Sequence, residues 1–125
     1  MKSKYCCINN YLNDKQIKDI NNLYKNTPDN FKEKANTLKT STAKKIPLLE
    51  ILKIQNVEHT IIDINRKVFG FDIYENINDG VIQNKYTNKG QYKWHYDGES
   101  FNHNYTIKLT TLINVSEEEY TGGKF

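Results

Sequence analysis

Apolar positions in the first third of the chain recur with the period of a helix. After position 13 they are Ile17, Ile20 and Tyr24. Asn13, followed three residues later by Gln16, has the form of an N-cap with its capping-box partner. The pattern therefore predicts a helix from about Asp14 to Tyr24, ended by the Thr27-Pro28 turn.

A second apolar stripe, with 3,4,3,4 spacing, predicts another helix. Its members are Ile54, Val57, Ile61, Ile64 and Val68. Gly70 is a suitable C-terminal stop. His59 lies two positions off the stripe, and we interpret it as a half-exposed helix histidine in preference to a ligand.

From residue 71 onward the apolar period changes to two, which is typical of strands. The predicted strands are residues 71–74, 81–86, 91–97, 105–114 and a start at 124, after two weaker ones at 5–8 and 40–46. Asn88-Lys89-Gly90 predicts a short turn of the hairpin kind. Two helices followed by an antiparallel sheet define an α+β fold.

Composition narrows the function classes. The 125 residues suit one domain, and the formal charge of +3 comes from scattered lysines with a single arginine. This favours a solvated surface over a nucleic-acid interface, so no nucleic-acid partner is expected. Cys6 and Cys7 are adjacent and form neither a disulfide framework nor a CxxC motif. No apolar run approaches 18 residues, so we expect a soluble cytoplasmic protein without a membrane partner.

The stretch YKWHYDGESF, residues 92–101, contains the strongest candidate chemistry. On a strand, His95 and Asp97 project to one face, while Trp94 and Tyr96 project to the other. An imidazole nitrogen and a carboxylate oxygen on one face can fill two neighbouring positions of a metal ion. A third ligand would complete the two-histidine, one-carboxylate set of non-haem Fe(II) oxygenases. The pair alone is weak evidence, because a carboxylate two places after a histidine is common by chance.

The surrounding sequence resembles a known family. The runs VIQNKYTNKGQYKWHYDGE and IKLTTLINVSEEEYTGGKF are similar to the first half of the catalytic core of Fe(II)- and 2-oxoglutarate-dependent dioxygenases of the prolyl 4-hydroxylase type. The matching positions, in order, are Tyr86, Gly90, Tyr92, Trp94, His95, Asp97, Lys108, Leu109, Asn114, Tyr120, Gly122 and Gly123. The resemblance covers the whole chain and is strongest over residues 81–125.

The resemblance assigns roles to individual residues. It implies that His95 and Asp97 are the first two iron ligands and that the hydroxyl of Tyr86 contacts the distal carboxylate of 2-oxoglutarate. For Tyr86 the alternative is a strand tyrosine that packs on the helices. Two apolar residues match positions that line the co-substrate pocket, where core packing is equally consistent, namely Leu112 and Phe125.

Other residues near the pair are expected to have no ligand role. We expect Tyr92 and Trp94 to be core residues on the opposite face, and His103 to lie in a loop. In the family's order, the second histidine and the Lys or Arg that pairs with 2-oxoglutarate come after the position of Phe125.

The resemblance also implies a fold and an activity. Residues 1–78 would be a helical support region packed on an antiparallel double-stranded β-helix (jelly roll), whose first half is residues 79–125. The activity is hydroxylation with Fe(II), dioxygen and 2-oxoglutarate, with ascorbate keeping the iron reduced. The substrate is peptidyl proline by analogy, or another protein, peptide or small molecule.

The sequence as given would be a fragment of such an enzyme, binding Fe(II) poorly and inactive alone. Two alternatives are a non-catalytic jelly-roll binding module and a degenerate remnant. A third, a small nucleic-acid binder, rests only on the charge and the tyrosines.

Overall fold

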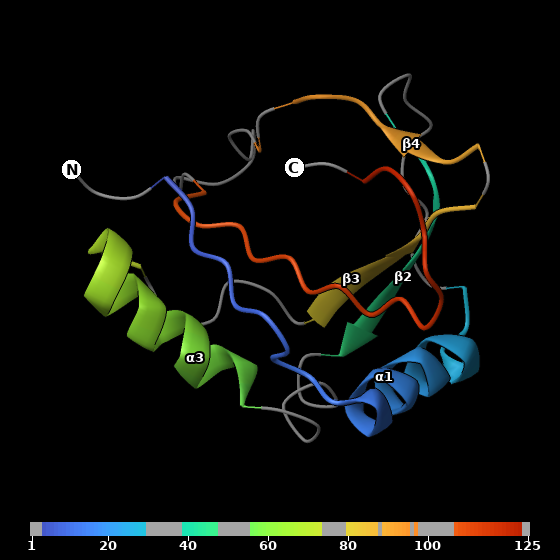
Figure 1. The fold of residues 1–125 in the computed structure, drawn as a ribbon, viewed down its shortest axis with the longest axis horizontal. Helices are drawn as coiled ribbons and strands as arrows, with labels where there is room; N and C mark the ends of the chain where they lie inside the picture. Colours follow the sequence, from blue (N-terminus) through green and yellow to red (C-terminus); the bar gives the residue numbers. More distant parts are fainter. Residues whose placement is uncertain are drawn as a thin grey trace.

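The computed structural model confirms the α+β class. It describes residues 4–29, 39–47, 56–73, 80–87, 89–95, 97 and 107–123. Its elements are α1 (Asp14–Asn26), β1 (Lys39–Thr40), β2 (Thr42–Pro47), α3 (Val57–Ile64), a π-helical turn η1 (Asn65–Phe69), β3 (Gly80–Lys85) and β4 (Gln91–Tyr92). In Figure 1, α1 lies below strands β2 and β3, α3 lies to their left, and the extended segment 107–123, orange to red, passes across the two strands above α1. Within the described ranges, no helix has the length and apolar character needed to cross a membrane.

Helix α1 forms where the sequence predicts it and continues two residues further, to Asn26. Both halves of the capping box are present: Asn13 Oδ1 accepts from the Gln16 amide, and Gln16 Oε1 accepts from the Asn13 amide, each at 2.9 Å. At the other end the Thr27 hydroxyl donates to the Leu23 carbonyl at 2.7 Å. Local hydrogen bonds therefore fix both ends of the helix.

Helix α3 and η1 carry the second apolar stripe. Val57 is buried and His59 is exposed, as predicted, whereas Ile54 lies outside the described residues. The helix widens into η1 and ends at Gly70, whose φ of 64° is left-handed. The side-chain amide of Asn65 then donates to the Phe71 carbonyl at 2.8 Å and accepts from the Phe71 amide at 3.1 Å. This buried amide holds the chain reversal after the helix.

The four strands form an antiparallel ribbon made of two strand pairs. Strand β2 pairs with β3, with Ile46 opposite Val81, and β1 pairs with β4, with Lys39 opposite Tyr92. Strands β3 and β4 thus pair with β2 and β1 in two separate two-stranded sheets and not with each other, so the predicted hairpin between them is wrong. Asn88 of the predicted turn lies outside the described residues. The pairing of β2 with β3 joins the predicted support region, residues 1–78, to the predicted core region, residues 79–125.

Gly90 lies against the backbone of β1 just before β4 begins. Its amide donates to the Thr87 carbonyl at 2.6 Å. A β-carbon at this position would stand 3.0 Å from the backbone oxygens of both Thr40 and Thr87. The close approach of backbone explains why the position needs glycine.

Several predicted strands do not form. Residues 5–8, 71–73, 93–95 and 107–114 are described but are not strands, and position 97 is not in one either. The alternating pattern is present in some of them, but a strand also needs a hydrogen-bonded neighbour. The predicted strand ends at 74, 96, 105–106 and 124 lie outside the described residues.

A small core connects the helices, the ribbon and the C-terminal segment. Ile20 of α1, Ile46 of β2 and Val57 of α3 are buried together. The partly buried side chains around them are Tyr11, Leu12, Leu23, Tyr24, Ile61, Val81, Ile113 and Val115. Cys6 and Cys7 are exposed free thiols, consistent with the predicted lack of a disulfide.

Asn21 of α1 ties the C-terminal segment to this core. Its side-chain amide donates to the Val115 carbonyl at 2.8 Å and to Glu117 Oε1 at 2.9 Å. Its oxygen accepts from Gln83 Nε2 of β3 at 2.8 Å. One side chain therefore connects α1, β3 and the segment that follows residue 107.

Candidate metal site

His95 and Asp97 face each other just beyond the end of β4. Nε2 of His95 lies 3.3 Å from Oδ1 of Asp97, and the two side chains are 28% and 41% exposed. The predicted strand through these residues is wrong, since pairing stops at Tyr92. The predicted convergence of the two side chains is nevertheless present.

The far side of the imidazole is held by the chain next to it. Nδ1 of His95 lies 2.7 Å from the Lys93 carbonyl, which can only accept a hydrogen bond. Nδ1 therefore carries the proton, and in the neutral ring Nε2 presents a lone pair to Asp97. The ring also stacks on Tyr92, with centroids 3.8 Å apart. The ammonium of Lys39 lies 5.0 Å from the centroid of the Tyr92 ring.

The far oxygen of Asp97 is held by a residue distant in sequence. The Thr110 hydroxyl donates to Oδ2 of Asp97 at 2.5 Å. This leaves Oδ1 directed at His95. Nδ1 of His95 and Oδ2 of Asp97 are thus each hydrogen-bonded to another group, while the inner atoms, Nε2 and Oδ1, face each other.

The geometry fits a cation between the two inner atoms. A lone pair on Nε2 and a carboxylate oxygen repel each other unless a proton or a metal ion lies between them. Neighbouring ligands in an octahedral site with bonds of about 2.1 Å stand about 3.0 Å apart, close to the separation here. A ligating histidine whose other nitrogen donates to a carbonyl is the common arrangement around protein-bound metals. An imidazolium–carboxylate ion pair without a metal has the same geometry.

The described part of the chain brings together two candidate ligands and no third. It contains no cluster of three or more histidine, cysteine, aspartate or glutamate side chains. His103, Tyr96 and Phe125 lie outside the described residues, so their predicted places are untested. Tyr86, the predicted 2-oxoglutarate contact, follows β3 and is 43% exposed, and Leu112 is 66% exposed.

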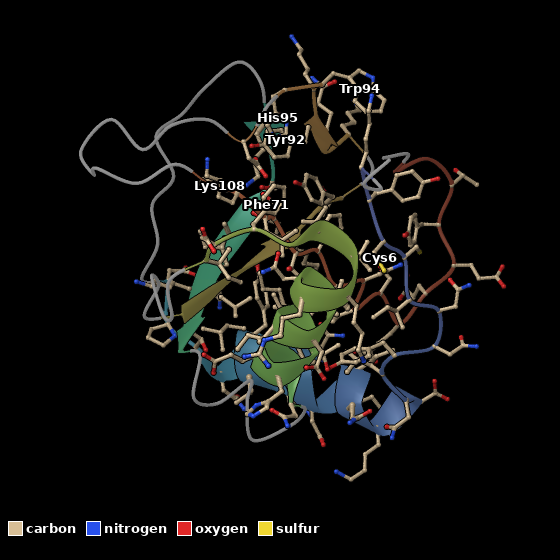
Figure 2. The ribbon with its side chains drawn as sticks, turned by 90° about the vertical axis from the view of Figure 1, so that its left-hand side faces the viewer. Cys6, Phe71, Tyr92, Trp94, His95 and Lys108 are labelled. Carbon is tan, nitrogen blue, oxygen red and sulfur yellow. The ribbon has the colours of Figure 1, made fainter. Side chains whose placement is uncertain are left out.

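The prediction that Tyr92 and Trp94 are core residues is wrong. Their exposures are 46% and 82%. Figure 2 shows Tyr92 and His95 together, with Trp94 set apart from them and Lys108 on the side toward Phe71. Strand β4 ends at Tyr92, so Trp94 is not in a sheet whose face could pack against the core.

Sequence reasoning missed the groups that orient the pair. The Lys93 carbonyl has no sequence signal, because every residue has a carbonyl. Thr110 stands in the Lys-Leu-Thr part of the motif, but nothing in that motif links it to Asp97, 13 positions earlier. The pairing of β3 with β2 and of β4 with β1 was also missed, whereas a turn before β4 was predicted.

Comparison with protein-family models, curated proteins and solved structures finds no match to this chain.

Proposed function

We propose that the chain supplies two ligands, His95 and Asp97, to the metal site of an Fe(II)- and 2-oxoglutarate-dependent dioxygenase of the prolyl 4-hydroxylase type. The observation that carries the proposal is the approach of Nε2 of His95 to Oδ1 of Asp97 at 3.3 Å, with Nδ1 and Oδ2 both engaged elsewhere. The ordered motif from Tyr86 to Gly123 supports it. The fold proposed around the site is a jelly roll, to which the antiparallel ribbon would contribute.

The chemistry that bound Fe(II) and 2-oxoglutarate supply is hydroxylation of a C–H bond by dioxygen, with ascorbate keeping the iron reduced. The chain's part is orientation. The Lys93 carbonyl accepts the Nδ1 proton of His95, so that Nε2 would be the coordinating atom. The hydroxyl of Tyr86 would donate to the distal carboxylate of 2-oxoglutarate. The third ligand would be a second histidine, and peptidyl proline is the proposed substrate.

The second candidate is a binding module of the same fold without redox chemistry. It is favoured by one observation: a protonated His95 would form an ordinary ion pair with Asp97 at the same 3.3 Å separation. In such a module the pair would be a structural contact near the end of β4. The two candidates differ in whether Fe(II) and 2-oxoglutarate bind together.

An anaerobic absorption measurement separates them. The full-length product of the reading frame, mixed with Fe(II) and 2-oxoglutarate, is expected to show the weak visible band of the chelated complex. The His95→Ala variant should lose the band. The control variant His59→Ala should keep it, because His59 is an exposed residue of α3. A wild-type protein without the band, or a band that survives in His95→Ala, would refute the dioxygenase and favour the module.

A further inference from the structure

Thr110 is hydrogen-bonded to Asp97 on the side away from His95. Its hydroxyl is the group that bonds Oδ2 of Asp97, and it comes from the extended segment that follows residue 107. We propose that Thr110 is a positioning residue of the metal site, which selects Oδ1 of Asp97 as the coordinating oxygen. The inference rests on the proposed function and extends it to a residue to which the family resemblance gives no role.

The first step of the argument concerns the carboxylate. Its two oxygens are chemically equivalent, and a side chain that is 41% exposed has room to rotate. A hydrogen bond of 2.5 Å from Thr110 to Oδ2 removes this equivalence, because the hydroxyl can only donate to a carboxylate. Oδ1 then remains for the cation on the side of His95.

The second step concerns how Thr110 is itself held. Further along its segment, Ile113 and Val115 pack against the core. Asn21 of α1 donates to the Val115 carbonyl at 2.8 Å. The segment is therefore held against α1 and the core. Because Thr110 belongs to this segment, its hydrogen bond ties Asp97 to the same part of the fold.

The third step is the contrast with the next residue. Thr110 and Thr111 are both exposed, but the hydroxyl of Thr110 bonds Asp97, and neighbouring side chains in an extended segment point in opposite directions. The two threonines therefore have the same chemistry and nearly the same place in the fold, but different surroundings. They form a matched pair for substitution.

The test measures the affinity of the full-length product of the reading frame for Co(II), an air-stable substitute for Fe(II), in the presence of 2-oxoglutarate. Thr110→Val, which keeps the shape and removes the hydroxyl, is expected to weaken binding by about 10- to 100-fold, as substitution of outer-shell partners does. Thr110→Ser should restore most of the affinity, and Thr111→Val should leave it unchanged. The Co(II) visible spectrum of Thr110→Val should also change, because the carboxylate is free to coordinate differently.

The outcomes are distinguishable from one another. If wild type binds Co(II) and Thr110→Val binds equally well with the same spectrum, the positioning role is overturned while the proposed function stands. If wild type binds no Co(II), the proposed function fails and this role fails with it. If Thr110→Val unfolds, Thr110→Ala decides: a loss of affinity that Thr110→Ser does not show supports the role, and affinity and spectrum equal to wild type in Thr110→Ala refute it.

Discussion

Nε2 of His95 and Oδ1 of Asp97 stand 3.3 Å apart although the strand that should align them has already ended at Tyr92. The alignment comes from two outer hydrogen bonds, to the Lys93 carbonyl and from the Thr110 hydroxyl. These two bonds, and not a strand, therefore orient His95 and Asp97. We expect substitutions in the pair to affect metal binding more than stability.

Asp97→Asn is expected to separate binding from stability. The amide keeps the shape of the side chain and can donate to Nε2, so the melting temperature should hardly change, because a partly exposed ion pair contributes roughly 0–1 kcal/mol. Co(II) affinity should fall at least about tenfold, since the coordinating charge is lost. Calorimetric titration and thermal unfolding check both parts. Asp72→Asn, at an exposed position, is the control, and an equal loss of affinity there would contradict the prediction.

Asn21→Ala is expected to loosen the C-terminal segment. The substitution removes the bonds to Val115, Glu117 and Gln83, and leaving such partners unsatisfied costs about 1–3 kcal/mol. Urea unfolding measures the loss, and hydrogen exchange should show faster exchange over residues 107–115. The exposed neighbour gives the control: Asn22→Ala should change the stability by no more than about 0.5 kcal/mol. Equal effects of the two variants would exclude a special role for Asn21.

Ile46→Ala is expected to be among the most destabilising substitutions in β2. Ile46 is 1% exposed at the centre of the core, and truncation of a buried isoleucine costs about 2–5 kcal/mol. Ile82, on the paired strand, is 46% exposed, so Ile82→Ala should cost less than half as much. Denaturant midpoints of the two variants make the comparison. Similar losses in the two variants would contradict the difference in burial between Ile46 and Ile82.

Tyr24 gives a pH-dependent prediction at the alkaline end. Burial of the phenol, and secondarily the negative charge of Asp29, raise the pKa of Tyr24 above its ordinary value near 10. The folded state thus holds this proton more tightly than the unfolded state does. Its contribution to stability is complete below about pH 10 and is lost as the pH rises through the folded-state pKa.

Two variants test this account of Tyr24. Tyr24→Phe should show a shallower fall in unfolding free energy above pH 10 than wild type does. Asp29→Asn should lower the pKa of Tyr24 only in part, because burial is the larger cause. Absorbance of the tyrosinate at alkaline pH follows the titration directly. A pKa that rises in Asp29→Asn would reverse the assigned sign.

Local features of the fold were predictable because their causes are local. Asn13 and Gln16 are three residues apart and bond each other, and Gly70 supplies the left-handed residue that ends its helical segment. The pairing of β2 with β3 joins residues 33 to 43 positions apart. The alternating pattern of a strand shows which side chains share a face, but it does not identify the partner strand.

The proximity of His95 and Asp97 was predictable, and the groups that orient them were not. His95 and Asp97 are two residues apart, so their convergence follows from short-range geometry even without a strand. The hydrogen bond from Thr110 depends on where the C-terminal segment lies, which Asn21 and the core determine. The exposure of Trp94 depends on where the ribbon ends, and its apolar character alone suggested burial.

The most direct test of the metal site is the nitrogen NMR spectrum of the histidine rings during addition of Zn(II) to the full-length product of the reading frame. We expect the Nε2 resonance of His95 to shift on Zn(II) binding, while Nδ1 keeps its proton and donates it to the Lys93 carbonyl. The ring of His59 on α3 should be unaffected. An unchanged Nε2 resonance of His95 at saturating Zn(II), or coordination through Nδ1, would contradict the account.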